Sequence, residues 1–157
     1  MESSLGDLVD VSIKVEESLN ELYKRFGELF PEDVELWNSL SLEEQNHIQM
    51  LSETRKPFIN GLFVNRLHDL KEIYKVVRHK LNFYKKLKKA DKAQAFEDAI
   101  ELETIRSRTH LDIARIKRIG KRTLRTFLFL NRRERNNAIR IKKHILNIRI
   151  KTAAATA

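Results

Sequence analysis

The chain has 157 residues, enough for one domain with a sizeable buried core, and 41% of them are hydrophobic while 34% are charged. It contains no cysteine, which excludes disulfides, thiolate catalysis, zinc fingers and rubredoxin-type iron centres in this chain. No stretch approaches the roughly 18 uninterrupted apolar residues of a membrane span, and the acidic start MESSLGDLVD lacks the basic region of a secretory signal. We therefore expect a cytoplasmic protein with no membrane partner.

The net charge of +9 is distributed unevenly along the chain. Residues 1–50 contain three Lys or Arg against twelve Asp or Glu, whereas after Thr104 sixteen basic residues face only Asp112 and Glu134. The basic second half could attract a nucleic acid, or the acidic half of another copy in a homo-oligomer. A solvated basic surface explains the same pattern. Because few aromatic residues in this half are placed to stack on bases, nucleic acid is the weaker alternative.

The first predicted helix covers roughly residues 8–29, because apolar residues recur every three or four positions from Val9 to Phe26. The sequence FPED then places Pro31 where a first helical turn tolerates proline, with acidic residues where a helix N-terminus favours them. A second helix follows over about residues 32–54. The short connection predicts that these two helices form an antiparallel hairpin.

The sequence RKPFINGLF breaks the helical pattern with Pro57 and Gly61. A third amphipathic stretch runs from Asn65 to about Lys89, and its outer face is basic. We interpret this stretch as part of a long crossover.

A fourth helix is predicted to begin near Asp91, and a fifth covers about residues 123–150 after a turn at Gly120. The last residues, 151–157, are predicted to form a disordered tail. Residues 1–150 would then form a single all-α domain, an antiparallel four-helix bundle. Ferritin-like bundles have this chain path: a helix hairpin, then a long helical crossover, then a second helix hairpin.

Each of the predicted bundle helices carries an acid whose neighbours at helical spacing are apolar: Glu16, Glu44, Glu103 and Glu134. His47 follows Glu44 by three positions, on the same helix face. A buried lone carboxylate is costly because its charge loses solvation. Acids that converge in one core therefore imply cations among them, and metal ions bridged by carboxylates are the usual solution in a bundle. The alternative is that some of these acids face solvent and others pair with Arg or Lys.

The segments VEESLNELYKRF (residues 15–26) and SLEEQNHIQML (residues 41–51) resemble the rubrerythrin-like branch of the ferritin-like superfamily. The resemblance spans roughly residues 8–148. It implies a di-iron or related site, built from a Glu on each of two helices and Glu-x-x-His on the other two. The metal ligands that it implies in this sequence are Glu16, Glu44, His47, Glu103 and Glu134.

The same resemblance implies an oxidoreductase that uses peroxide or dioxygen. Its electrons would come from a separate donor protein, because a fused rubredoxin domain needs cysteines that this chain lacks. Iron is the implied metal, and manganese or zinc are the alternatives.

The second Glu-x-x-His of that pattern is replaced here by Glu134-Arg-Asn-Asn137. An amide oxygen is a poorer transition-metal ligand than an imidazole. The neighbouring Arg132, Arg133 and Arg135 add positive charge that would further oppose a bound cation. His110 and His144 lie on inward-facing positions but lack the family spacing. We therefore expect a partly degenerate di-metal site, with a tighter metal near His47 and a weak position near Asn137. If all chemistry is lost, the alternative is a non-catalytic scaffold for protein association.

Overall fold

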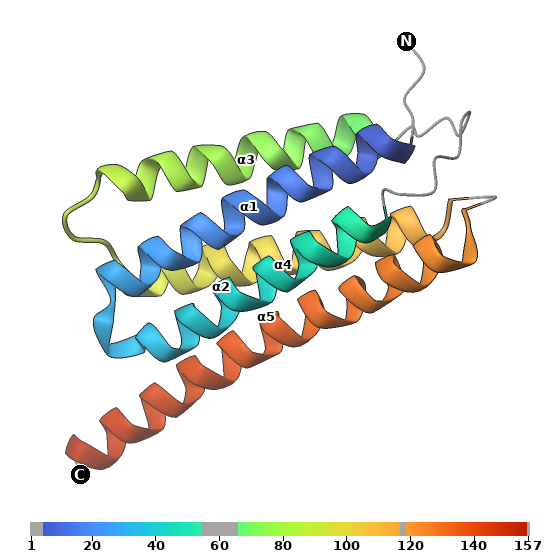
Figure 1. The fold of residues 1–157 in the computed structure, drawn as a ribbon. Helices are drawn as coiled ribbons and strands as arrows, with labels where there is room; N and C mark the ends of the chain where they lie inside the picture. The colour runs from blue at the N-terminus through green and yellow to red at the C-terminus, as the bar shows by residue number, and fades with distance from the viewer. Residues whose placement is uncertain (1–4, 55–65, 117–118, 157) are drawn as a thin grey trace.

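The computed structural model describes residues 5–54, 66–116 and 119–156, and the regular structure within these ranges is helical throughout (Figure 1). The prediction of an all-helical protein is therefore confirmed for the described residues. Among the described helices, none combines the length and the apolar character that a bilayer crossing requires. In chain order the elements are α1 (Leu5–Leu29), the 3-10 helix η1 (Pro31–Asp33), α2 (Val34–Thr54), α3 (Arg66–Lys86), α4 (Lys92–Ala114) and α5 (Lys121–Thr156).

The helices pack as two hairpins that lie side by side (Figure 1). Helix α1 packs along α2, and α4 packs along α5, while contacts between α2 and α5 join the two pairs. Helix α3 lies along α1 and also reaches α4. This arrangement brings the middle of α1, α2, α4 and α5 around a common interior.

The connection between α1 and α2 is tight because proline cannot continue the first helix. Pro31 opens η1, where its missing N–H removes no helical hydrogen bond. The backbone N–H of Phe30 donates to Phe26 O at 2.8 Å, and that of Asp33 donates to Phe30 O at 3.0 Å. The FPED sequence therefore reverses the chain within one turn, as predicted.

Aromatic side chains from four helices fill the core at the end of the hairpins nearest η1. Trp37 of α2 stacks on Tyr23 of α1, with ring centroids 5.9 Å apart, and on Phe96 of α4 at 5.3 Å. Phe26 packs edge-on against Tyr84 of α3 at 4.7 Å. None of the five is more than 3% exposed. These contacts fix α1, α2, α3 and α4 relative to one another beside the polar cluster described below.

The start of α4 lies where the sequence predicts it, whereas α5 continues beyond its predicted end. Asp91 caps α4 by accepting a hydrogen bond from the Gln94 N–H at 3.3 Å. Residues 151–156, expected to be disordered, form the exposed last turns of α5, which extends past the other helices (Figure 1). Alanine has the highest helix propensity, and adding residues to an existing helix avoids the cost of nucleation. The predicted break at RKPFINGLF, residues 55–63, lies outside the described residues.

Asp33 links η1 to α4 and α5. Its side chain is 5% exposed, with Lys92 Nζ 2.8 Å from Oδ2 and His144 Nε2 2.8 Å from Oδ1. Burial by itself would raise the pKa of Asp33, but the contacts with Lys92 and His144 hold that pKa below its usual value. The ionised carboxylate therefore stabilises the packing of three elements.

We expect Asp33→Asn to lower the free energy of unfolding by about 1–2 kcal/mol at neutral pH. Because the folded-state pKa is lowered, this contribution is present above the ordinary Asp pKa of about 3.9 and is lost as pH falls through the folded-state value. Urea denaturation of both proteins between about pH 7 and pH 3 should show the difference shrinking with acidity. The exposed Glu35→Gln serves as the control. A difference that stays constant over this range would contradict the assignment.

Candidate metal centre

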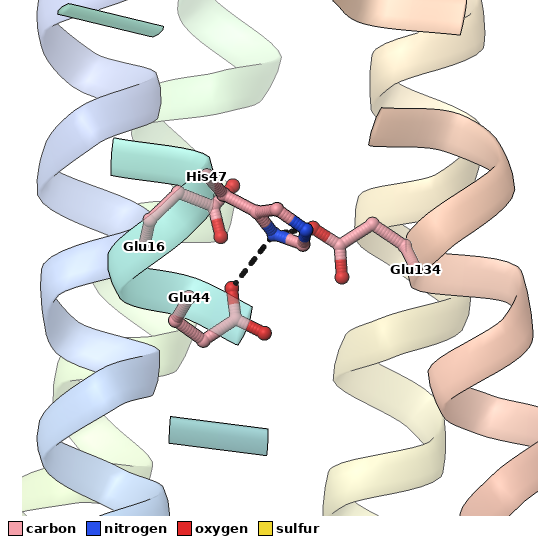
Figure 2. Close-up of side chains that lie close together, drawn as sticks. All are labelled: Glu16, Glu44, His47 and Glu134. Atoms are coloured by element: carbon pink, nitrogen blue, oxygen red, sulfur yellow. Dashed lines mark hydrogen bonds and ion pairs between the residues drawn. The ribbon is translucent and has the colours of Figure 1, made fainter. Parts of the chain in front are cut away.

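Polar side chains from three helices meet in the interior, between the hairpins (Figure 2). Glu16 comes from α1, Glu44 and His47 from α2, and Glu134 from α5. None of the four is more than 1% exposed. One potential ligand atom from each residue lies within 4.8 Å of those of the other three. Four of the five predicted ligands are thus brought together in one place.

His47 lies between two of these carboxylates (Figure 2). Its Nδ1 is 3.3 Å from Glu44 Oε2 and 3.2 Å from Glu134 Oε1. Its other nitrogen, Nε2, faces Glu43 Oε2 at 3.8 Å, and Glu43 is held in turn by Arg133. A carboxylate behind an imidazole is a common way to orient a metal-binding histidine. The geometry therefore presents Nδ1 to the cluster and places Glu43 behind the ring.

The charges around His47 favour its protonated form. Burial lowers the pKa of His47, but the carboxylates of Glu134, Glu16 and Glu43 raise it above its ordinary value overall. The imidazole therefore acts as an internal cation for these acids when its proton is bound.

Glu103, the fifth predicted ligand, is buried in α4 but is not part of the four-residue group. Its Oε1 accepts a hydrogen bond from the Tyr23 hydroxyl at 2.5 Å. Burial and the nearby Glu134 carboxylate raise the pKa of Glu103 well above its usual value. Glu103 therefore lies next to the cluster, with one oxygen occupied by Tyr23.

Arg106 of α4 is the important residue that sequence reasoning missed. Its guanidinium is fully buried, and both Nε, at 3.0 Å, and Nη2 donate to Glu16 Oε1. Burial raises the pKa of Glu16, but the guanidinium, together with hydrogen bonds from His110 and Glu44, lowers this pKa to about 2. The sequence did hold a signal: Arg106 follows Glu103 by three positions and precedes His110 by four, so all three share one face of α4.

Of the two further histidines on inward positions, only His110 reaches the cluster. Its Nε2 lies 3.1 Å from Arg106 Nη2, 3.3 Å from Glu16 Oε1 and 3.4 Å from Glu134 Oε1. His144 instead contacts Asp33, because it follows Glu134 by ten positions and so lies about 15 Å further along the helix.

The residues expected to weaken the second metal position behave differently from one another. Asn137 is 1% exposed, and its Oδ1 accepts a hydrogen bond from Arg140 at 3.3 Å rather than contributing to the cluster. Arg132 and Arg135, adjacent to Glu134 in sequence, are exposed, because neighbouring residues point to different sides of a helix. The positive charge that contacts the buried acids of the cluster comes instead from Arg106, which lies on α4.

Each of the four buried glutamate carboxyl groups has an oxygen without a hydrogen-bond partner. Among the described residues, Glu16 Oε2, Glu44 Oε1, Glu103 Oε2 and Glu134 Oε2 have no hydrogen-bond partner. Burial, followed by the carboxylates of Glu134, Glu103 and Glu16, raises the pKa of Glu44 well above its usual value. A metal cation would satisfy several such oxygens at once, and three carboxylates with one imidazole form a donor set that iron, manganese and zinc accept. The residues present therefore fit a metal ion.

No family model matches this chain, and neither a curated protein nor a solved structure matches it.

We expect Tyr23→Phe to lower the free energy of unfolding by about 1–3 kcal/mol, because the change removes the hydroxyl that donates to the buried Glu103 carboxyl. Urea denaturation at neutral pH measures the effect. The matched control is Tyr74→Phe, at a partly buried position on α3, which should change stability much less. Equal stabilities of Tyr23→Phe and the unmodified protein would contradict a structural role for this hydrogen bond.

Proposed function

We propose that this chain is a metal-binding protein with a ferritin-like, rubrerythrin-like four-helix bundle, in which Glu16, Glu44, His47 and Glu134 hold one transition-metal ion. The observation that carries the proposal is the convergence of these buried groups, with ligand atoms within 4.8 Å of one another. The packing of α1 with α2 and of α4 with α5, with α3 between the two hairpins in sequence, supports the proposed bundle.

The charges of the interior favour a single ion. Arg106 already supplies one fixed positive charge to Glu16, inside the cluster. Iron is the first candidate metal because the sequence resemblance implies it, and manganese or zinc would accept the same donors. An iron ion bound there would supply a one-electron redox couple.

The oxidoreductase activity that the resemblance implies relies on two cooperating metal ions. With one ion, turnover of peroxide or dioxygen should be slow or absent, and the proposed role is metal binding itself. A separate electron-donor protein belongs to the proposal only if turnover is found.

Metal analysis of protein purified without chelator tests the proposal, and we expect about one equivalent per chain, as for a single site. His47→Ala should reduce metal affinity by more than the roughly 10–100-fold that is typical of changes outside the ligand set. His79→Ala, an exposed position on α3, is the matched control and should bind like the unmodified protein. Calorimetric titration with Mn²⁺ measures all three proteins, and circular dichroism checks that each is folded. If the unmodified protein binds no metal, or if His47→Ala binds as tightly, the proposal is wrong.

Metal affinity should also rise with pH. Because the pKa of Glu44 and the pKa of His47 are both raised, these groups hold protons that a metal ion must displace before they can serve as ligands. For each proton displaced, affinity should increase about tenfold per pH unit below the pKa concerned. Titrations in buffers of different ionisation enthalpy count the protons released. An affinity that does not change between about pH 5.5 and pH 7.5 would contradict proton displacement at the site.

A further inference from the structure

We propose that Arg106 occupies a second metal position and thereby limits the centre to one ion. This inference rests on the proposed metal-binding function and explains the number of ions bound. It concerns the side of the cluster that faces α4, away from His47.

The Arg106 guanidinium blocks two potential ligand atoms at the same time. Its Nε and Nη2 both donate to Glu16 Oε1, and Nη2 lies 3.1 Å from His110 Nε2. A guanidinium has donors but no acceptor. A metal ion at His110 Nε2 would therefore lie against a cationic group that can only repel it.

Glu134 is placed between the two positions. Its Oε1 lies 3.2 Å from His47 Nδ1 and 3.4 Å from His110 Nε2. A carboxylate that lies between two imidazoles is suited to bridge two metal ions. The first position has Glu44 and His47, the second would have His110, and Glu16 and Glu134 would be shared between the two.

His110 thus supplies, from α4, the imidazole that Asn137 no longer supplies from α5. The missing histidine is not what limits this position, since another imidazole already lies there. The fixed charge limits it, because a cation bound beside the guanidinium would be repelled at short distance in a region shielded from water. Arg106 is 0% exposed and remains charged, so it cannot leave by losing its proton.

The nearby acids make this substitution of a side chain for a metal ion tolerable. Four carboxylates are buried in the interior with 0% exposure: Glu16, Glu44, Glu103 and Glu134. One guanidinium and one trivalent ion would balance them, as would one guanidinium, one divalent ion and one retained carboxyl proton. Without the guanidinium, two divalent ions would balance them.

The experiment compares Arg106→Met with two variants that keep the guanidinium. Arg106→Met removes the charge but keeps much of the side-chain volume. Arg108→Met removes an exposed charge from the same helix, and Asn137→His restores the sequence motif while leaving Arg106 in place. Each full-length protein is titrated with Mn²⁺, and the number of ions per chain is counted by calorimetry and metal analysis. Electron paramagnetic resonance then distinguishes isolated Mn²⁺ from a magnetically coupled pair.

We expect Arg106→Met to bind two Mn²⁺ per chain with the spectrum of a coupled pair, while the unmodified protein, Arg108→Met and Asn137→His each bind one. If Arg106→Met does not fold without metal, the count is made on protein refolded with Mn²⁺, and recovery with two equivalents supports the proposal. Three results would overturn the role of Arg106 without touching the proposed function. These are one ion in Arg106→Met, two ions in Asn137→His, or failure of Arg106→Met to refold with any amount of Mn²⁺. No Mn²⁺ in the unmodified protein would instead overturn the proposed function.

Discussion

Carboxylates can share a dry helical core only if positive charge or protons lie among them, and the interior of this protein is organised around that constraint. Its buried acids divide into two kinds. Burial raises the pKa of each, but Arg106 together with His110 and Glu44 lowers the pKa of Glu16, and contacts with Glu103, His47 and His110 lower that of Glu134. The pKa values of Glu44 and Glu103 are raised instead. The four acids therefore differ in how readily they hold a proton, and the two with lowered pKa values, Glu16 and Glu134, lie beside Arg106 and His47 respectively.

The helices around the cluster hold this arrangement in place through contacts at its edges. On the side nearest η1, Tyr23 connects the aromatic core to the polar cluster, because its ring stacks on Trp37 while its hydroxyl donates to Glu103. On the α2–α5 side, Glu43 links Arg133 to the back of the His47 ring. Glu16, Glu103 and Glu134 are each oriented by their own helix and by a neighbour on a different helix. A site built in this way is preorganised before any ion binds.

Much of the fold and part of the candidate site could be predicted because they depend on local sequence. Helical periodicity predicted the helices, Pro31 and Asp91 marked two of their boundaries, and apolar neighbours singled out the inward-facing acids. The cation was missed because an arginine is usually exposed, and its partner Glu16 lies 90 residues away. Periodicity shows which face a residue occupies but not which helix will face it. For the same reason the arginines next to Glu134 in sequence were misleading, and the placement of His110 beside Glu134 could only come from the structure.

The complete burial of the cluster also has a consequence for the rate at which ions can exchange. His47 is 1% exposed and both Glu16 and Glu134 are 0% exposed, while Glu43, Arg133 and Arg140 join α2 to α5 on the outside. A bound ion would enter or leave during a local separation of helices, so its rate of exchange would depend on how often such openings occur. A bound ion would make those openings rarer, because it binds the closed state alone. Once an ion is bound, the centre would therefore release it slowly.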